Sequence, residues 1–174
     1  MTTEPKFIPN EAVEISLANN LKFKTRLVDC VGYLVDNAIG YLEDDMPRMV
    51  KTPWSEEEIP FEKAAEIGTK KVIEEHSTIG ILVTTDGSVT GIPREDYIKP
   101  EERVVAELKS LNKPFVILLN STDPNSDYTK ELSKTLAEKY DTTVIPINCE
   151  YLDINDINNI FSKILYEFPA DQIR

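Results

Sequence analysis

An aspartate and a glycine with the spacing Asp29-x-x-Gly32 follow an apolar stretch early in the chain. A carboxylate at the end of a buried strand costs free energy when it is half-buried and unpaired. A metal ion, or a phosphate group that carries one, would pair it, because Mg²⁺ takes oxygen ligands. A turn is the simpler alternative, since Asp and Gly are both common turn residues. These four residues alone leave both interpretations open.

A second group of polar residues, Asn120-Ser121-Thr122-Asp123, follows an apolar run much further along the chain. Asn often closes a strand by bonding its own loop, and Asp before Pro is typical of a turn. The segment Asp86-Gly87 is also interpreted as a turn at a strand end. Whether any of these residues contacts a ligand depends on the elements that position them.

Three short, apolar, β-branched runs predict strands that are buried on both faces. Amphipathic helices are predicted between and after them, and the last helix is expected to be capped by Asn155. The predicted strands are 78–85, 113–120 and 141–148, and the clearest predicted helices are 100–112 and 155–168. Alternation of strand and helix predicts an α/β fold, with a parallel sheet covered by helices on both sides.

The first third of the chain has a different pattern. Residues 12–18 and 21–29 predict two strands of a hairpin, joined by an Asn-Asn turn. Residues 33–60 show no clear periodicity, and so long a segment is typical of a functional loop or an insertion. Residues 61–76 predict a helix with Phe61, Ala64, Ala65, Gly68 and Val72 facing inward.

With 174 residues, the chain is long enough for one domain with a substantial core. Its formal net charge of -12 argues against unaided binding to nucleic acid or to an anionic membrane, since both are polyanions. Cys30 and Cys149 are expected to be reduced thiols rather than a disulfide or a zinc site. No apolar run approaches the roughly 20 residues of a membrane span, and MTTEPKF is unlike a signal peptide. We therefore expect a cytoplasmic protein.

A hairpin, a strand that ends in D-x-x-G and three strand–helix units follow one another in the order of a GTPase-like P-loop NTPase. In that fold, the strand-end carboxylate, here Asp29, holds the Mg²⁺ of a nucleotide through water, and the amide of Gly32 can face the terminal phosphate. A threonine that completes the metal shell is expected just before the hairpin. Thr2 and Thr3 occupy that place, and Thr3 is the candidate ligand.

The same fold has a base-reading motif after the second of the later strands. Here that motif is Asn120-Ser121-Thr122-Asp123, without the lysine that is typical of guanine readers. A loop that folds over the base is expected after the last strand, where Cys149 lies. The order of these features therefore predicts a nucleotide site that includes Asn120, Asp123 and Cys149.

Several longer segments carry a family resemblance: TTEPKF, RLVDCVGY, PRMVKTPW, IPFEKAAEIGTKKVIEEHSTIG and ILYEFP. Together they resemble the stage IV sporulation protein A family of endospore-forming bacteria, over essentially the whole chain. The resemblance implies a cytoskeleton-like ATPase that polymerises on the forespore surface and forms the base on which the spore coat is built. It implies that Thr2 and Thr3 are paired sensor threonines needed for hydrolysis, and that Asp29 is the Walker B aspartate.

The resemblance also implies the cofactors and partners. ATP and Mg²⁺ would be bound by the intact protein. The expected partners are further copies of the protein, spore coat proteins and a small membrane-bound anchoring peptide, reached mostly through regions outside this chain. The expected location is the mother-cell cytoplasm, at the surface of the outer forespore membrane.

One family motif has no counterpart in this sequence. None of the six glycines is followed by Lys-Ser or Lys-Thr, so there is no G-x-x-x-x-G-K-[ST] phosphate-binding loop. We therefore expect residues 1–174 to form a partial ATPase domain: a three-layer, mostly parallel sheet with an N-terminal antiparallel hairpin, lacking the P-loop strand. Such a piece is expected to bind ATP weakly or not at all, and to leave strand edges exposed.

Three other functions remain as alternatives. A guanine-specific regulatory GTPase is disfavoured by the missing lysine, and nucleotide competition on the full protein would decide. A phospho-accepting receiver domain would need a lysine at the end of the last strand, where the sequence is IPINCE. The third alternative is a non-catalytic interaction module.

Overall fold

The computed structural model describes residues 5–17, 21–38, 40–43 and 46–168. The chain divides into two compact units, Met1–Ser77 and Thr78–Arg174. Each unit is described by itself.

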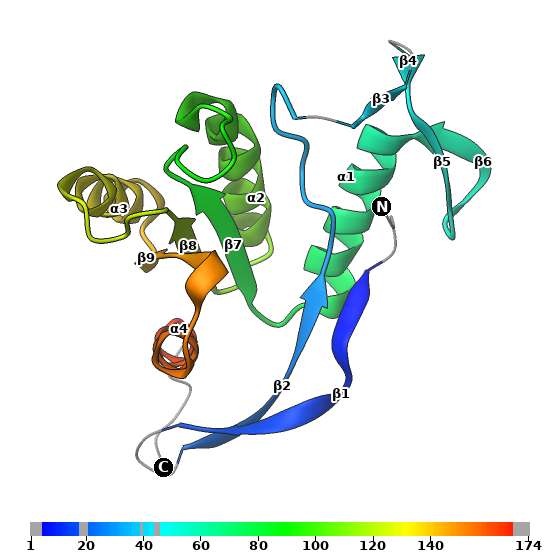
Figure 1. Ribbon diagram of the computed structural model, residues 1–174. Helices are drawn as coiled ribbons and strands as arrows, with labels where there is room; N and C mark the ends of the chain where they lie inside the picture. Colours follow the sequence, from blue (N-terminus) through cyan, green and yellow to red (C-terminus); the bar gives the residue numbers. More distant parts are fainter. Residues whose placement is uncertain (1–4, 18–20, 39, 44–45, 169–174) are drawn as a thin grey trace. The chain divides into compact units, whose positions relative to one another are not determined.

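The second unit contains a three-stranded parallel sheet in the order β7-β8-β9 (Figure 1). The strands are β7 (Gly80–Thr85), β8 (Phe115–Asn120) and β9 (Val144–Ile147). Each lies inside one of the apolar runs, so the predicted parallel strands are confirmed. Residues 115–119 of β8 are all buried, because this strand has a neighbour on each side and helices on both faces.

Three long helices cover the two faces of this sheet (Figure 1). α4 packs Ile160 and Ile164 against one face. α2 connects β7 to β8, and α3 connects β8 to β9, so both crossovers advance in the same direction across the sheet. Because such crossovers are right-handed, both helices lie on the face opposite to α4. These three layers are compatible with a Rossmann-like or P-loop-like fold. The helices are α2 (Ile98–Ser110), α3 (Asp127–Tyr140) and α4 (Ile154–Tyr166), with the short helices η3 (Arg94–Tyr97) and η4 (Cys149–Tyr151).

Side-chain caps set the starts of α3 and α4. Ser126 accepts a hydrogen bond from the amide of Thr129 at the start of α3. In α4 the cap is Asp153, which accepts from the amides of Asn155 and Asp156 and forms a capping box with Asp156. The prediction that Asn155 caps this helix is therefore wrong. A capping box satisfies two terminal amide donors at once, which favours the earlier start.

The two outer edges of the parallel sheet carry different hydrogen-bonding groups. In a parallel strand, backbone groups alternate in direction from residue to residue. The amides of Gly80 and Asp86 donate to the β8 segment, so the odd-numbered residues of β7 face the outer edge, which has no neighbouring strand among the described residues. In β9, the carbonyls of Thr143 and Ile147 accept from the β8 segment. Pro146 therefore faces outward, where it offers no N–H.

The first unit begins with the predicted antiparallel hairpin, formed by β1 (Lys6–Ser16) and β2 (Lys22–Asp29). Its predicted Asn-Asn turn lies outside the described residues. The hairpin forms its own two-stranded sheet, and its side chains are mostly exposed; Leu27 is 48% exposed. The expectation of a buried strand before Asp29 is therefore wrong, because apolar side chains alone do not bury a strand that lacks a covering layer.

Two short antiparallel pairs occupy much of the segment 33–60. The helix that follows is α1, which continues into the π-helical turn η2. The predicted inward face of α1 is confirmed, since Phe61, Ala64, Ala65 and Gly68 are buried. The elements are β3 (Leu42–Glu43), β4 (Met46–Pro47), β5 (Met49–Thr52), β6 (Ser55–Pro60), α1 (Phe61–Lys71) and η2 (Val72–His76).

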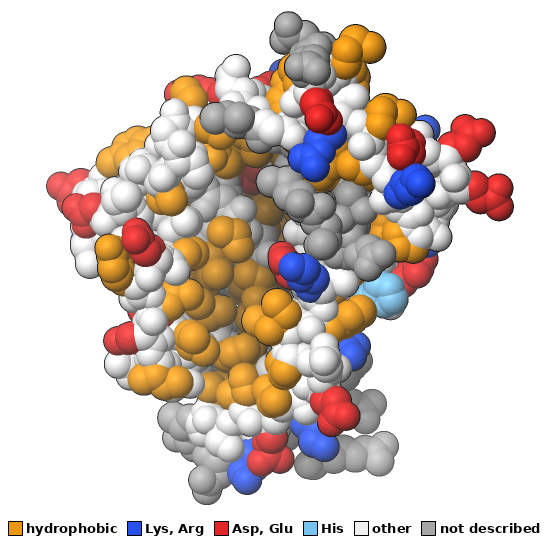
Figure 2. Space-filling view, turned by 45° about the vertical axis from the view of Figure 1, so that its right-hand side comes forward, with side chains coloured by type: hydrophobic (Ala, Val, Ile, Leu, Met, Phe, Trp, Pro, Cys, Tyr) orange, Lys and Arg blue, Asp and Glu red, His pale blue; other side chains and the backbone are white. Residues whose placement is uncertain are grey.

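Large hydrophobic side chains are exposed in both units, and Figure 2 shows hydrophobic side chains, in orange, at the surface. Examples are Val83 on β7, at 56% exposed, and Ile8 on β1, at 54%. None of the described helices is long and apolar enough to cross a membrane.

Candidate nucleotide site

Asn120 and Cys149 lie together at the carboxyl edge of the parallel sheet. Asn120 is the last residue of β8, and its Oδ1 accepts a hydrogen bond of 2.9 Å from the amide of Cys149. The Asn148 side chain also reaches the Thr122 carbonyl, at 3.5 Å. The segments that follow β8 and β9 therefore contact each other directly. In open α/β sheets, ligands bind at this edge.

Asp123 closes a tight turn in the same region. Its Oδ1 accepts from the amide of Asn125 at 3.2 Å, and its own amide donates to the Ser121 hydroxyl at 3.0 Å. These contacts match the turn interpretation of Asp before Pro. The side chain is exposed, so the carboxylate is also accessible to a ligand.

A cavity of about 400 Å³ borders the segment that follows β8 and the segment that follows β9. Its lining residues include Asn125, Asn148 and Tyr151, together with Lys130 and Asp156. The predicted base-contacting residues lie close to this lining in the chain but are not part of it: Asn120, Asp123 and Cys149. Two carboxamides and an aromatic ring are groups that can hydrogen-bond and stack with a planar heterocycle. The cavity therefore suits a small polar ring system.

Asp86 is the centre of a hydrogen-bond network at the end of β7. Its Oδ1 accepts from the amide and the hydroxyl of Ser88, at 2.9 and 2.6 Å. Its Oδ2 accepts from the hydroxyl of Thr129, the residue 43 positions later, at 2.9 Å. Burial raises the pKa of Asp86, but hydrogen bonds from Ser121, Ser88 and Thr129 outweigh burial and hold this pKa below its ordinary value.

Buried hydroxyls extend this network into the N-S-T-D segment. The hydroxyls of Ser121 and Thr129 lie 3.2 Å apart, and Ser126 donates to Thr129 at 2.8 Å. Sequence reasoning assigned Asp86 to a plain turn and gave these hydroxyls no role. The residues are far apart in the chain, so only the parallel pairing of β7 with β8 brings them together.

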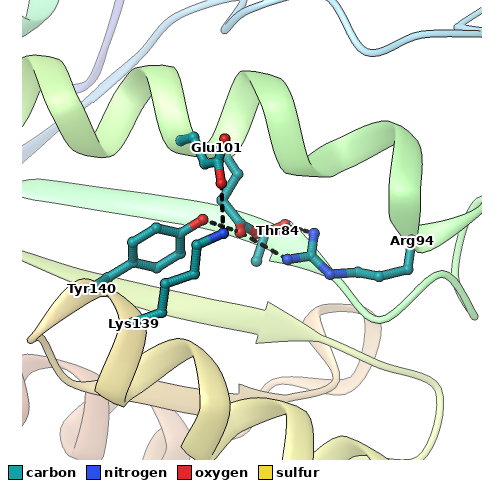
Figure 3. Close-up of polar contacts among 6 residues, drawn as sticks. Thr84, Arg94, Glu101, Lys139 and Tyr140 are labelled. Carbon is teal, nitrogen blue, oxygen red and sulfur yellow. Dashed lines mark hydrogen bonds and ion pairs between the residues drawn. The ribbon is translucent and has the colours of Figure 1, made fainter.

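A second polar cluster ties α2 to α3 and to β7 (Figure 3). Glu101, at 3% exposed, accepts from Arg94 at 2.7 Å and from the Tyr140 hydroxyl at 2.7 Å. Arg94 also donates to the Thr84 hydroxyl, at 3.3 Å. Burial, together with Glu101, raises the pKa of Tyr140. The cluster anchors the far end of the 86–94 loop, whose near end is held by Asp86.

In the first unit, Asp29 is an exposed carboxylate at the end of β2. Mg²⁺ is usually held by one or two carboxylates together with waters and phosphates, so the donor chemistry of Asp29 fits a water-mediated ion. No group of three or more His, Cys, Asp or Glu side chains that could hold a metal occurs within the described residues. Thr2 and Thr3 lie outside those residues.

Gly32 has a φ of +81°, and a Cβ there would meet no atom within 4 Å. The backbone conformation, rather than the space available, therefore requires glycine. Burial raises the pKa of the nearby Cys30 thiol and outweighs a hydrogen bond from the Gly32 amide, which lowers this pKa. Asp29 and Gly32 belong to the first unit, whereas Asn120, Asp123 and Cys149 belong to the second.

The chain is similar over its whole length to proteins of one family. The family model described as "Stage IV sporulation protein A, ATPase domain" matches residues 1–169. Stage IV sporulation protein A of Clostridioides difficile (strain 630) is 53% identical over 174 residues, or 100% of this chain. The proteins of that name from Bacillus anthracis and Bacillus subtilis (strain 168) are 52% and 49% identical over 173 residues, or 99% of it. The chain spans 35% of the length of each relative. No solved structure matches it.

Proposed function

Because the chain belongs to the stage IV sporulation protein A family, within its ATPase domain, we propose that the intact protein hydrolyses ATP and that this chain supplies part of the nucleotide site. The observation that carries the proposal is the match of the ATPase domain across residues 1–169. The contact between Asn120 and Cys149 at the carboxyl edge of the sheet supports it.

Asp29 and Gly32 act on the phosphate end of the nucleotide in this proposal. Asp29 orients the waters of a bound Mg²⁺, and the amide of Gly32 donates to the terminal phosphate. When bound, Mg²⁺ supplies neutralisation of the charge on the phosphate oxygens. Thr2 and Thr3 are the proposed sensor threonines, with Thr3 completing the metal shell. The exposure of Asp29 supports its role, since a hydrated ion can approach it.

Asn120, Asp123 and Cys149 act on the base. Without the lysine of guanine readers, the N-S-T-D segment is proposed to accept adenine rather than to select guanine. The adjoining cavity supports this role, because its carboxamides can pair with a heterocycle and Tyr151 can stack on it. We propose that the phosphate-binding loop of the intact protein lies in a segment that corresponds to a part of the relatives outside the matched span.

We also propose the cellular role that the family implies. Hydrolysis drives a conformational change that permits polymerisation on the forespore surface, which forms the basal layer for the spore coat. Other copies of the protein, coat proteins and a small membrane-bound peptide are the proposed partners. The proposed location is the mother-cell cytoplasm, at the outer forespore membrane.

The experiment that tests the activity is ATP hydrolysis by the intact protein with Asp29→Asn, measured beside Mg²⁺-ATP binding by calorimetry. We expect the hydrolysis rate to fall by a factor of roughly 100 or more, because the metal loses its charged partner. Glu57→Gln is the matched control, an exposed carboxylate of the same unit, and should hydrolyse ATP normally.

Wild-type intact protein that binds no ATP would overturn the proposal. Equal or tighter binding of GTP in competition would favour the regulatory GTPase instead. Calorimetry on residues 1–174 alone should show weak or no binding, because the backbone amides and lysine of a phosphate-binding loop normally make most of the phosphate contacts. Tight binding by this piece would show that the proposed phosphate-end residues are misassigned.

A further inference from the structure

Two loops of the second unit, 86–94 and 120–126, are joined at two places. At the first place, the Asp86 amide donates to the Asn120 carbonyl at 3.3 Å, and the Asp86 carboxylate accepts from Ser121. At the second place, the link is Ser88. Ser88 Oγ accepts a hydrogen bond of 3.0 Å from the amide of Thr122, the residue 34 positions later. Thr122 lies between the two residues proposed to contact the base, Asn120 and Asp123. Among the described residues of the 86–94 loop, Ser88 is thus the one whose side chain accepts a hydrogen bond from the backbone of the N-S-T-D segment.

Asp86 decides how the Ser88 hydroxyl points. A hydroxyl has one hydrogen to donate and two lone pairs to accept. The Ser88 hydrogen goes to Asp86 Oδ1, at 2.6 Å, and this leaves a lone pair for the Thr122 amide. Asp86 is itself held by the buried Thr129 through its other oxygen. The orientation of Ser88 thus comes from a fixed carboxylate.

We propose that Ser88, oriented by Asp86, is a positioning residue for nucleotide binding: it holds the Thr122 amide so that Asn120 and Asp123 present their side chains to the base. This proposal rests on the proposed function, since it assumes that the N-S-T-D segment contacts the nucleotide. Ser88 itself touches no nucleotide in this scheme. It acts through the backbone of the segment that does.

The position of Ser88 makes the proposal testable without unfolding the protein. Its side chain is exposed, so removal of the hydroxyl leaves no cavity in the core. Thr122 is also exposed, so water can satisfy its amide once Ser88 is gone. The expected consequence of Ser88→Ala is therefore a less ordered N-S-T-D segment rather than a less stable domain.

The experiment compares Ser88→Ala, Ser88→Thr and Ser110→Ala in the intact protein, by steady-state ATP hydrolysis and thermal melting. We expect Ser88→Ala to raise the KM for ATP about three- to tenfold, with kcat changed less than about twofold, because base contacts contribute equally to substrate and transition-state binding. Ser88→Thr keeps the hydroxyl and should restore the wild-type KM. Ser110→Ala removes an exposed hydroxyl that bonds only the Glu107 carbonyl and should change neither constant.

Asn120→Ala and Asp123→Ala distinguish a failure of the positioning role of Ser88 from a failure of the proposed base contact. If these variants raise the KM and a folded Ser88→Ala does not, the positioning role of Ser88 is overturned while the proposed function stands. If neither they nor Ser88→Ala change the KM, the base contact is misassigned and the positioning role falls with it. A Ser88→Ala protein that only melts earlier, with an unchanged KM, also contradicts the proposal.

Discussion

At the scale of single residues, the chemistry of the second unit is concentrated on carboxylates whose partners come from elsewhere in the chain. Asp86 shows the limit of sequence reasoning: the Asp-Gly pair predicted a turn, and the turn exists, since Gly87 has a φ of +93°. The hydrogen bond between Asp86 and Thr129 depends on the register in which β7 pairs with β8. That register cannot be predicted from the residues around Asp86. Asn120 was easier to predict, because a polar residue directly after an apolar run marks the carboxyl end of a strand.

The pKa of Asp86 predicts a pH dependence of stability. A carboxyl whose pKa is lower in the folded chain than the unfolded value of about 3.9 stabilises the fold above that value, and this stabilisation is lost as the pH falls through the folded pKa. We expect Asp86→Asn to destabilise the chain by roughly 1–3 kcal/mol at pH 7, and by progressively less below about pH 4. Urea unfolding at a series of pH values measures this difference.

Glu57→Gln makes the same change in net charge at an exposed position and serves as the reference for that series. A difference between Asp86→Asn and wild type that stays constant from pH 7 to about pH 3 would contradict the assignment of a low pKa.

The positive φ of Gly32 predicts a separation of stability from activity. Left-handed backbone costs a residue with a Cβ roughly 1–2 kcal/mol. Gly91 has a φ of +74° and similarly open surroundings. We therefore expect Gly32→Ala and Gly91→Ala to lower the free energy of unfolding by similar amounts, while only Gly32→Ala slows ATP hydrolysis by the intact protein. Equal activity in the two variants would remove Gly32 from the proposed site.

At the scale of the elements, α2 and α3 are joined by two neighbouring contacts of different kinds. Glu101 is buried and bonds Arg94 and Tyr140, whereas Glu102 pairs with Lys139 at 2.6 Å on the surface. The apolar face of α2 was predictable from its periodicity, and Val105 and Leu108 are buried as that periodicity indicates. The burial of Glu101 was not predictable in this way, because it depends on how α2 faces α3.

This difference predicts unequal costs of substitution at adjacent positions. Glu101→Ala leaves the half-buried Arg94 and the buried Tyr140 without their shared acceptor, and we expect a loss of about 3–5 kcal/mol. Glu102→Ala removes an exposed ion pair, and we expect a loss of about 0–1 kcal/mol. Chemical unfolding of the two variants measures both values. Similar values for the two variants would show that Glu101 is not buried as described.

At the scale of the whole molecule, burial is unevenly distributed along the chain. Residues 115–119 of β8 are buried, whereas the side chains of β1 and β2 are mostly exposed. Sequence reasoning predicted both groups of strands but not this difference. A strand's own residues encode its tendency to pair, whereas its burial depends on which other elements cover it.

Hydrogen exchange tests this distribution directly. We expect the amides of β8 to exchange most slowly, close to the rate set by global unfolding, and the amides of the β1–β2 hairpin to exchange faster by a factor of roughly 100 or more. Mass spectrometry of peptic peptides resolves the two regions. Comparable protection of the hairpin and of β8 would contradict the predicted difference.

The position of Pro146 limits how this sheet can combine with other strands. The outer edge of β9 lacks an amide donor at Pro146, whereas β7 presents the backbone donors and acceptors of Ile81, Val83 and Thr85. A sheet with a single receptive edge can accept one strand only. Pairing of two such edges about a two-fold axis would consume both and stop at a dimer. An assembly of many copies therefore needs a contact of another kind, made by surfaces other than the edges of this sheet.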